Sequence, residues 1–217
     1  MEDLQNFLEI SSRDHNHLCP RQILGVRIGL KGICSLHIEP NHNSKRLLVI
    51  TETDGCFADG LSAVTNCTVG HRTLHVKDYG KAAATFVDTQ SGRAIRVAPV
   101  LNIRERACDF VPDEPRHYFA QMQAYQIMPD EEMMTVQEVF LNTPIEWIVS
   151  RPGLRVNCDV CGEEIMNERE SLRDGLTLCR ACTGNAYYQT GNATQILFDE
   201  VRSRQNVERY RSLEANT

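Results

Sequence analysis

Four cysteines near the C-terminus constrain this chain more than any other feature of its sequence. They form two Cys-x-x-Cys pairs with seventeen residues between them: Cys158, Cys161, Cys179 and Cys182. Each pair brings two sulfurs to one point, and two pairs supply the tetrahedral thiolate set of a structural zinc site. A redox dithiol is the weaker interpretation, because two pairs are present at zinc spacing. We therefore predict one zinc ion that stabilises a small module and, with four protein ligands, has no open position for catalysis.

The overall charge and composition limit the classes of partner. The chain has 217 residues and a net charge of −6, from 29 acidic against 23 basic residues. This balance argues against broad binding to nucleic-acid phosphates, which depends on clustered Lys and Arg. The N-terminus MEDLQNFLEI is acidic and short of apolar length, and no apolar run could span a bilayer. We expect a cytoplasmic protein without membrane partners, whose nine cysteines are metal ligands or reactive thiols rather than disulfides.

Helix and strand patterns are mixed along the chain without regular alternation, which predicts the α+β class. The predicted helices are an amphipathic segment around Leu4 to Leu8, one starting at Pro20, one starting near Cys56, and the ranges 114–127, 135–141 and, weakly, 193–212. The predicted strands are 46–53, a hairpin of 84–89 with 93–98, and a short strand within 143–153. Pro152-Gly153 marks a break. We therefore predict a core domain over 1–152 and a zinc-finger domain with a C-terminal helix over 153–217.

Three glycines recur along one side of the second predicted helix. Gly25, Gly29 and Gly32 stand at spacings of four and three. Glycine destabilises a helix, so its use there is typical of close approach by another backbone. Chance is the alternative interpretation of this spacing.

A second group of metal-binding residue types lies near the N-terminus. His15, His17 and Cys19 alternate along one segment, so their side chains point the same way if the segment is extended. Imidazole and thiolate together suit a zinc-type divalent metal. Cys56 stands where a helix is predicted to start, a position that lowers a thiol pKa, and Cys67 closes the same segment. Free cysteines are usually small buried hydrophobes, and spacing alone does not bring Cys56 to Cys19.

Three ordered motifs resemble the FmdE family, which takes its name from formylmethanofuran dehydrogenase. The motifs are HNHLCPRQILGVRIG, ETDGCFADGLSAVTNCTVGHRTL and DYGKAAATFVDTQSGRAIRVAP, within about residues 10–100. The C-terminal cysteines are similar to those of two-domain members. The resemblance implies a thioredoxin-like α+β core, with a mixed five-stranded sheet flanked by helices, followed by a treble-clef zinc finger.

The resemblance also implies where a metal-binding active site would lie. It assigns the site to His17 and Cys19 in the first motif and Cys56 in the second, with Cys67 as a less certain member. Asp54 and Asp59 lie beside Cys56, either as hydrogen-bond acceptors for the ligands or as helix-capping groups. Family members often have glycines where this chain has Asn16 and Arg21. Neither position is a ligand, so the metal interpretation stands, and Arg21 is expected to narrow or charge the pocket mouth.

Three functions follow as hypotheses. The first is a metal-binding accessory protein or partner subunit of a molybdenum or tungsten formylmethanofuran dehydrogenase-type system, because this chain lacks the spare cysteines for an iron–sulfur cluster. The second is an enzyme in its own right, either a zinc-dependent hydrolase or a thiol-redox protein that pairs Cys19 with Cys56. The third is a zinc-finger regulator that binds nucleic acid, which the charge disfavours. A homodimer is also expected, from the apolar first helix and the glycine-lined second helix.

Overall fold

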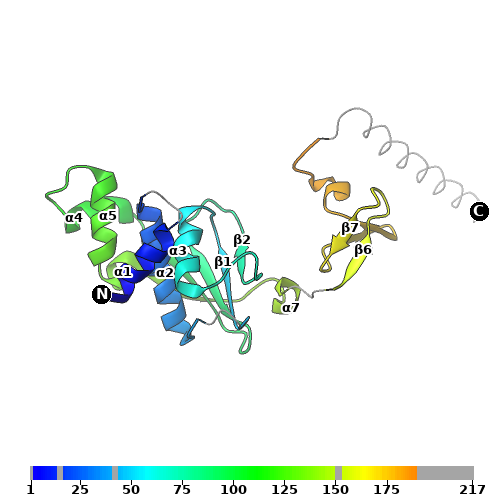
Figure 1. The fold of residues 1–217 in the computed structure, drawn as a ribbon, viewed down its shortest axis with the longest axis horizontal. Coiled ribbons are helices and arrows are strands. Elements are labelled where there is room, and N and C mark those ends of the chain that lie inside the picture. Colours follow the sequence, from blue (N-terminus) through cyan, green and yellow to red (C-terminus); the bar gives the residue numbers. More distant parts are fainter. Residues whose placement is uncertain (1, 14–16, 41–43, 150–152, 190–217) are drawn as a thin grey trace, which may run out of the picture. The chain divides into compact units, whose positions relative to one another are not determined.

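The computed structural model describes residues 2–13, 17–40, 44–149 and 153–189, and it divides the chain into two units, 1–149 and 150–217 (Figure 1). Each unit is described by itself. No helix in the described ranges has the length and apolarity needed to cross a membrane.

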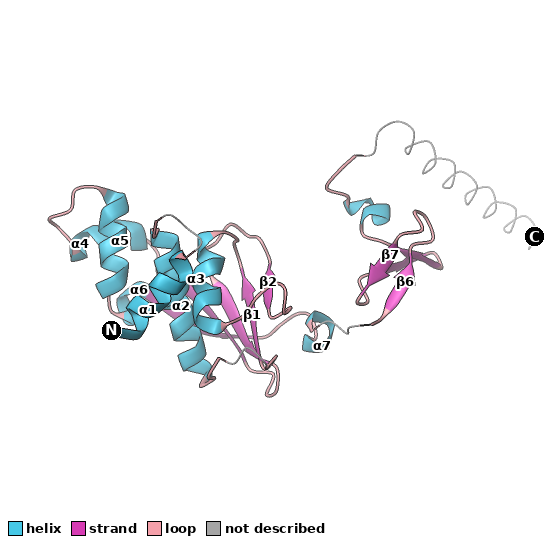
Figure 2. Ribbon diagram, viewed as in Figure 1, coloured by secondary structure: helices cyan, strands magenta, loops and turns pink. Residues whose placement is uncertain are grey.

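The first unit combines a mixed five-stranded sheet with helices, as predicted (Figure 2). Strand order is β2-β1-β3-β4-β5, with β1 and β2 parallel and the other neighbours antiparallel. The α+β class and the mixed sheet are confirmed, whereas the thioredoxin-like label stays a prediction. Its elements are α1 (Glu2–Ser12), α2 (Pro20–Leu36), β1 (Leu47–Thr51), α3 (Cys56–Thr65), β2 (Leu74–Val76), β3 (Ala84–Asp88), β4 (Ala94–Pro99), α4 (Ile103–Phe110), α5 (His117–Ile127), α6 (Asp130–Met133), β5 (Met134–Val139) and α7 (Ile145–Ile148).

The two faces of the sheet are covered differently. Val49, Phe86 and Ile95 are cross-strand neighbours that face the main core, where α2 and α3 pack. Leu48 and Val87 face the other way, into a smaller apolar cluster with residues of α7. The large core therefore lies between the sheet and the helices that carry the N-terminal motifs.

Close helix packing explains the glycines of α2. A Cβ atom at Gly25 would overlap the carbonyl oxygen of Phe57, and one at Gly60 of α3 would overlap that of Gln22. Gly29 lies against Val64, farther along both helices, so α2 and α3 run side by side in the same direction. The predicted close approach of another backbone is confirmed at Gly25, whereas Gly29 and Gly32 face the side chains of Val64 and Phe86. The contact at Gly25 brings the N-terminal ends of the two helices together.

Two local predictions in this unit are wrong. Residues 135–141 were expected to be helical, but Met134–Val139 forms β5, an edge strand paired with β4. The expected strand within 143–153 contains α7 instead, a single turn that begins after Pro144. At β5, pairing with β4 is a tertiary constraint that outweighs a weak helical periodicity. At α7, the local constraint is the proline before its first residue, which favours a helix start.

The second unit contains two small hairpins and a helical turn. Strands β6 (Arg155–Asn157) and β7 (Glu164–Met166) form one hairpin, and β8 (Ser171–Arg173) and β9 (Leu176–Leu178) form the other. The helical turn η1 (Ala181–Asn185) follows. Asp174 and Gly175 both have positive φ angles at the β8–β9 turn, as a tight hairpin requires. The helix predicted over 193–212 lies outside the described residues, and the treble-clef label stays a prediction.

Candidate metal centres

The four C-terminal cysteines converge on one point. One sulfur from each of Cys158, Cys161, Cys179 and Cys182 lies within 4.8 Å of the others. The first two lie in the loop between β6 and β7. Of the second two, Cys179 directly follows β9 and Cys182 lies in η1. Four thiolates at this separation match the ligand set of a closed tetrahedral zinc site. The predicted zinc-binding cluster is therefore confirmed as an arrangement of donors.

Backbone N–H groups donate hydrogen bonds to these sulfurs, which favours their thiolate form. The amide of Cys179 donates to the sulfur of Cys158 at 3.3 Å, and the amide of Cys182 donates to the sulfur of Cys179 at 3.4 Å. Burial opposes ionisation of Cys158, but backbone N–H groups, including those of Cys161 and Cys179, lower its pKa to about 6. Burial and the neighbouring sulfurs raise the pKa of Cys182. A divalent cation at this point would stabilise all four cysteines as thiolates.

A second pair of thiols lies in the first unit, where α2 and α3 begin. Cys19 is the residue that caps α2, and Cys56 is the first residue of α3. The Cys19 side chain is one of the groups that raise the pKa of Cys56, so the two thiols lie within interaction range of each other. The close packing of α2 and α3 therefore brings Cys19 of the first motif near Cys56 of the second. The spacing of these residues in the sequence could not predict that proximity.

Cys19 is held by a capping box. Its sulfur accepts from the backbone N–H of Gln22 at 3.4 Å, while the Gln22 side chain accepts from the backbone N–H of Cys19 at 3.0 Å. The fully buried Gln22 amide also donates to the carbonyl oxygen of Ser11 at 2.8 Å, which ties α2 to α1. Gln22 was not predicted from the sequence, although a glutamine three residues after a polar cap is the capping-box pattern with Cys in place of Ser.

The segment before Cys56 is fixed by a partly buried ion pair. Gly55 adopts a φ of 64°, which favours glycine, and α3 starts directly after it. Four residues before Cys56, the buried carboxylate of Glu52 accepts from both Nε and Nη2 of Arg96, the latter at 2.8 Å. The strand β4 thereby anchors the loop that presents Cys56. Asp59 lies in the first turn of α3, where a carboxylate stabilises a helix, and its two predicted roles, as a capping group or as an acceptor for the ligands, stay predictions.

The surroundings of the pair include one cation and one phenol. The helix start was expected to lower the pKa of Cys56, but burial and then the Cys19 thiol raise it, and they outweigh the lowering by the charge of Arg21. Burial and the charges of Cys19 and Cys56 raise the pKa of the Tyr118 hydroxyl, which places that side chain of α5 within electrostatic range of both thiols. Arg21 was expected to narrow or charge the pocket mouth, and its charge acts on Cys56. Tyr118 was not predicted, because nothing in its local sequence connects it with the motifs.

Of the two histidines of the first motif, the structure describes His17. His17 is exposed and lies two residues before Cys19, and His15 lies outside the described residues. Within the described ranges, the four C-terminal cysteines are the one group of three or more His, Cys, Asp or Glu side chains whose ligand atoms converge on a point. The described structure thus brings Cys19 and Cys56 together. The role of His17 as a third ligand stays a prediction.

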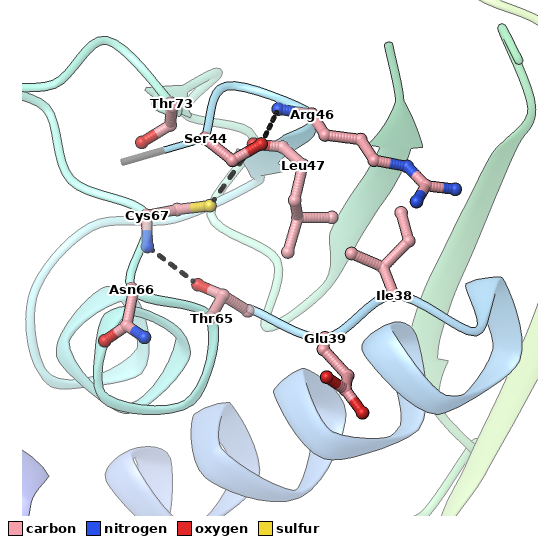
Figure 3. Close-up of a pocket in the computed structure, with 9 residues that line it drawn as sticks. All are labelled: Ile38, Glu39, Ser44, Arg46, Leu47, Thr65, Asn66, Cys67 and Thr73. Carbon is pink, nitrogen blue, oxygen red and sulfur yellow. Dashed lines mark hydrogen bonds between the residues drawn. The ribbon is translucent and has the colours of Figure 1, made fainter. Parts of the chain in front are cut away.

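Cys67 belongs to a different part of the core. It follows the C-terminal end of α3, whose ten residues separate it from Cys56 by about 15 Å of helix. Its buried thiol donates to the carbonyl oxygen of Leu47 at 3.5 Å, beside a small pocket (Figure 3). Burial raises its pKa. The structure therefore does not bring Cys67 to the proposed ligands, and its role there is that of a buried, hydrogen-bonded thiol.

The fold and the donor sets define a two-unit protein, with an α+β unit that carries a thiol pair and a four-cysteine zinc finger. Residues 15–146 match the family described as FmdE, Molybdenum formylmethanofuran dehydrogenase operon. The chain belongs to the FmdE family. Residues 152–188 match the prokaryotic dksA/traR C4-type zinc finger.

Two relatives are similar over most of this chain. A curated Archaeoglobus fulgidus protein, described as a probable S-adenosyl-L-methionine-binding protein, is 26% identical over 210 residues. The match covers 87% of this chain but 55% of that protein, so the chain spans about half the length of this relative. The crystal structure of an FmdE-like protein from Syntrophus aciditrophicus, described by its likeness to a component of tungsten formylmethanofuran dehydrogenase, superimposes with a TM-score of 0.57 at 20% identity. The match covers 86% of this chain and 95% of that chain, and this likeness supports the fold alone.

Proposed function

We propose that this chain is a metal-binding accessory protein of a molybdenum or tungsten formylmethanofuran dehydrogenase-type system. The observation that carries the proposal is the proximity of Cys19 and Cys56, which come from separate family motifs and stand at the starts of two closely packed helices. Membership of the FmdE family supports the choice of system. The zinc finger is the structural part of the protein, and the thiol pair is its functional part.

The donor chemistry of the pair fits a divalent metal such as zinc. Cys19 and Cys56 would supply two thiolates, and His17 would supply an imidazole from the exposed segment just before Cys19. Zinc with three protein ligands keeps a position for water or for a ligand from a partner, and it activates whatever binds there. Arg21 and Tyr118 would then contact that position, one as a cation and the other as a hydrogen-bonding phenol.

The metal part of this proposal is tested by metal content. Cys19→Ser, Cys56→Ser and His17→Ala should each remove or weaken one bound metal while the finger keeps its zinc. Cys34→Ser is the matched control, because Cys34 is an exposed thiol of the same helix α2. Unchanged metal content in the Cys19 and Cys56 variants would refute the core site. A reversible Cys19–Cys56 disulfide that forms without metal would instead favour the thiol-redox alternative.

The accessory role is tested separately by binding. Metal-loaded protein should form a complex with purified catalytic subunits of a formylmethanofuran dehydrogenase in size-exclusion chromatography. Absence of a complex with both the molybdenum and the tungsten enzymes would contradict the role. A calorimetric titration with S-adenosyl-L-methionine is a useful third measurement, because the Archaeoglobus relative is described as a probable binder of that molecule. Saturable binding would favour a different function for the core.

A further inference from the structure

A second contact between a thiol and an imidazole lies outside the metal centres, in the hairpin formed by α4 and α5. The sulfur of Cys108 lies 3.4 Å from Nδ1 of His117. Cys108 is half-buried in the last turn of α4, and His117 is the exposed first residue of α5. The pair is open to solvent and thus to a reagent.

The hairpin holds this pair in place from both sides. Ala107 and Ala120 are fully buried where α4 and α5 pack together. In the connecting loop, Arg116 donates to Glu114 at 2.8 Å, and its guanidinium lies over the ring of Phe119 at 4.1 Å. The residue before His117 is thereby fixed, so the imidazole meets the thiol as part of an ordered helix start.

An unfilled hydrogen-bonding position accompanies the thiol. The hydroxyl of Tyr125 is buried without a hydrogen-bond partner in the described part of the chain. It belongs to α5 and lies within electrostatic range of Cys108 on α4. Buried hydroxyls are normally paired, so the α4–α5 hairpin holds a phenol whose hydrogen-bonding capacity is unused.

We propose that Cys108 is a thiol modification site, with His117 as its general base and a low-molecular-weight disulfide as its reagent. Nδ1 of His117 accepts the thiol proton, and the Cys108 thiolate attacks one sulfur of the disulfide. A new sulfur–sulfur bond forms as the old one breaks. The departing thiolate takes up the proton from the imidazolium and leaves as a thiol, so the exchange is balanced.

The site is distinct from the proposed metal site but close to it in the chain. His117 is followed directly by Tyr118, the side chain near Cys19 and Cys56. No residue of the modification site is a proposed metal ligand. The two proposals therefore fail independently.

The test compares two cysteines within one molecule. Full-length, zinc-loaded protein is incubated with oxidised glutathione, and the mixed disulfide at each cysteine is followed by peptide mass spectrometry. Cys34 is the internal control, because it is exposed on α2. We expect Cys108 to react at least about tenfold faster than Cys34, since a positioned general base supplies that much or more.

Replacing the imidazole separates its role from exposure. In His117→Gln and in His117→Ala, the rate at Cys108 should fall to within about twofold of the Cys34 rate, since the general base is lost. The rate at Cys34 should not change, which also shows that the fold is intact. Cys19→Ser should leave the Cys108 rate unchanged. Equal rates at Cys108 and Cys34 in the wild-type protein, or no loss in either His117 variant, would overturn the proposal.

Discussion

The two thiol clusters of this chain are built in different ways. In the finger, four cysteines within 25 positions, from Cys158 to Cys182, converge through two short local turns. In the core, Cys19 and Cys56 meet because α2 and α3 pack at backbone contact along glycine positions. The finger site is closed by its own four ligands, whereas a metal held at the core pair, as we propose, would keep coordination positions open. The difference is the basis of our proposal that the finger metal stabilises structure and that exchangeable chemistry belongs to the core.

The largest predicted effect is on the finger alone. Cys161→Ser, or a strong chelator, should abolish the folded hairpins β6–β7 and β8–β9, because structural zinc contributes about 10–16 kcal/mol in isolated zinc fingers. The signals of the core unit should remain, since it has its own hydrophobic core. Heteronuclear NMR spectra before and after chelation provide the measurement. Finger resonances that stay dispersed without metal would break the comparison.

The next effect is confined to the core and tests how its thiols are brought together. Gly60→Ala should destabilise the protein by about 1–3 kcal/mol or more, since the new methyl group would overlap the carbonyl oxygen of Gln22. It should also weaken any metal bound at Cys19 and Cys56 by moving the helix starts apart.

Urea denaturation followed by circular dichroism measures the stability change. Gly70→Ala is the matched control: no atom lies within 4 Å of a Cβ there, so we expect a change within about 0.5 kcal/mol. If Gly60→Ala were as stable as Gly70→Ala, the close packing would not be what joins the two cysteines.

A smaller effect concerns the core unit, whose stability should fall in acid as an ion pair is lost. Both carboxylate oxygens of Asp88 accept from Arg46 at 3.0 Å, and this ion pair, helped by Gln90 and Ser91, lowers the Asp88 pKa to about 2. Because the folded pKa is below the unfolded one, the stabilisation is present above about pH 4 and is lost as the pH falls toward 2. It amounts to at most about 2 kcal/mol, since Arg46 is partly exposed to solvent.

The variant Asp88→Asn should therefore flatten the decrease in core stability between about pH 5 and pH 2. The measurement is the free energy of unfolding at each pH, monitored by core signals. Arg46→Gln removes the other partner and should have the same effect. A wild-type acid profile in both variants would show that this pair does not contribute to the pH dependence.

The sequence predicted the parts of the molecule that depend on local spacing. Two Cys-x-x-Cys pairs define the finger, because each turn geometry is complete within a few residues. The hairpin of β3 and β4 was predicted for the same reason, from the glycine in its turn. The close approach at Gly25 was predicted as one of two alternatives, because only packing shows what a missing side chain makes room for.

The remaining features depend on contacts between distant segments. The strand β5 was expected to be a helix, since its identity comes from pairing with β4 along the edge of the sheet. Tyr118 of α5 lies within electrostatic range of the thiol pair. Cys67 lies away from the pair because the length of α3 separates it from Cys56. No spacing rule contains either fact. Resemblance to a family named the candidate ligands, but packing decides which of them meet.

The number of metal ions bound by the full-length chain decides whether the core is a second metal centre. Native mass spectrometry of zinc-loaded protein should give two zinc ions per chain for the wild-type protein and for Cys34→Ser, and one for Cys19→Ser and for Cys56→Ser. Removal of the second ion by those two variants alone would place it at the pair where α2 and α3 begin. One zinc ion in all four proteins would contradict the central claim that the core binds a metal of its own.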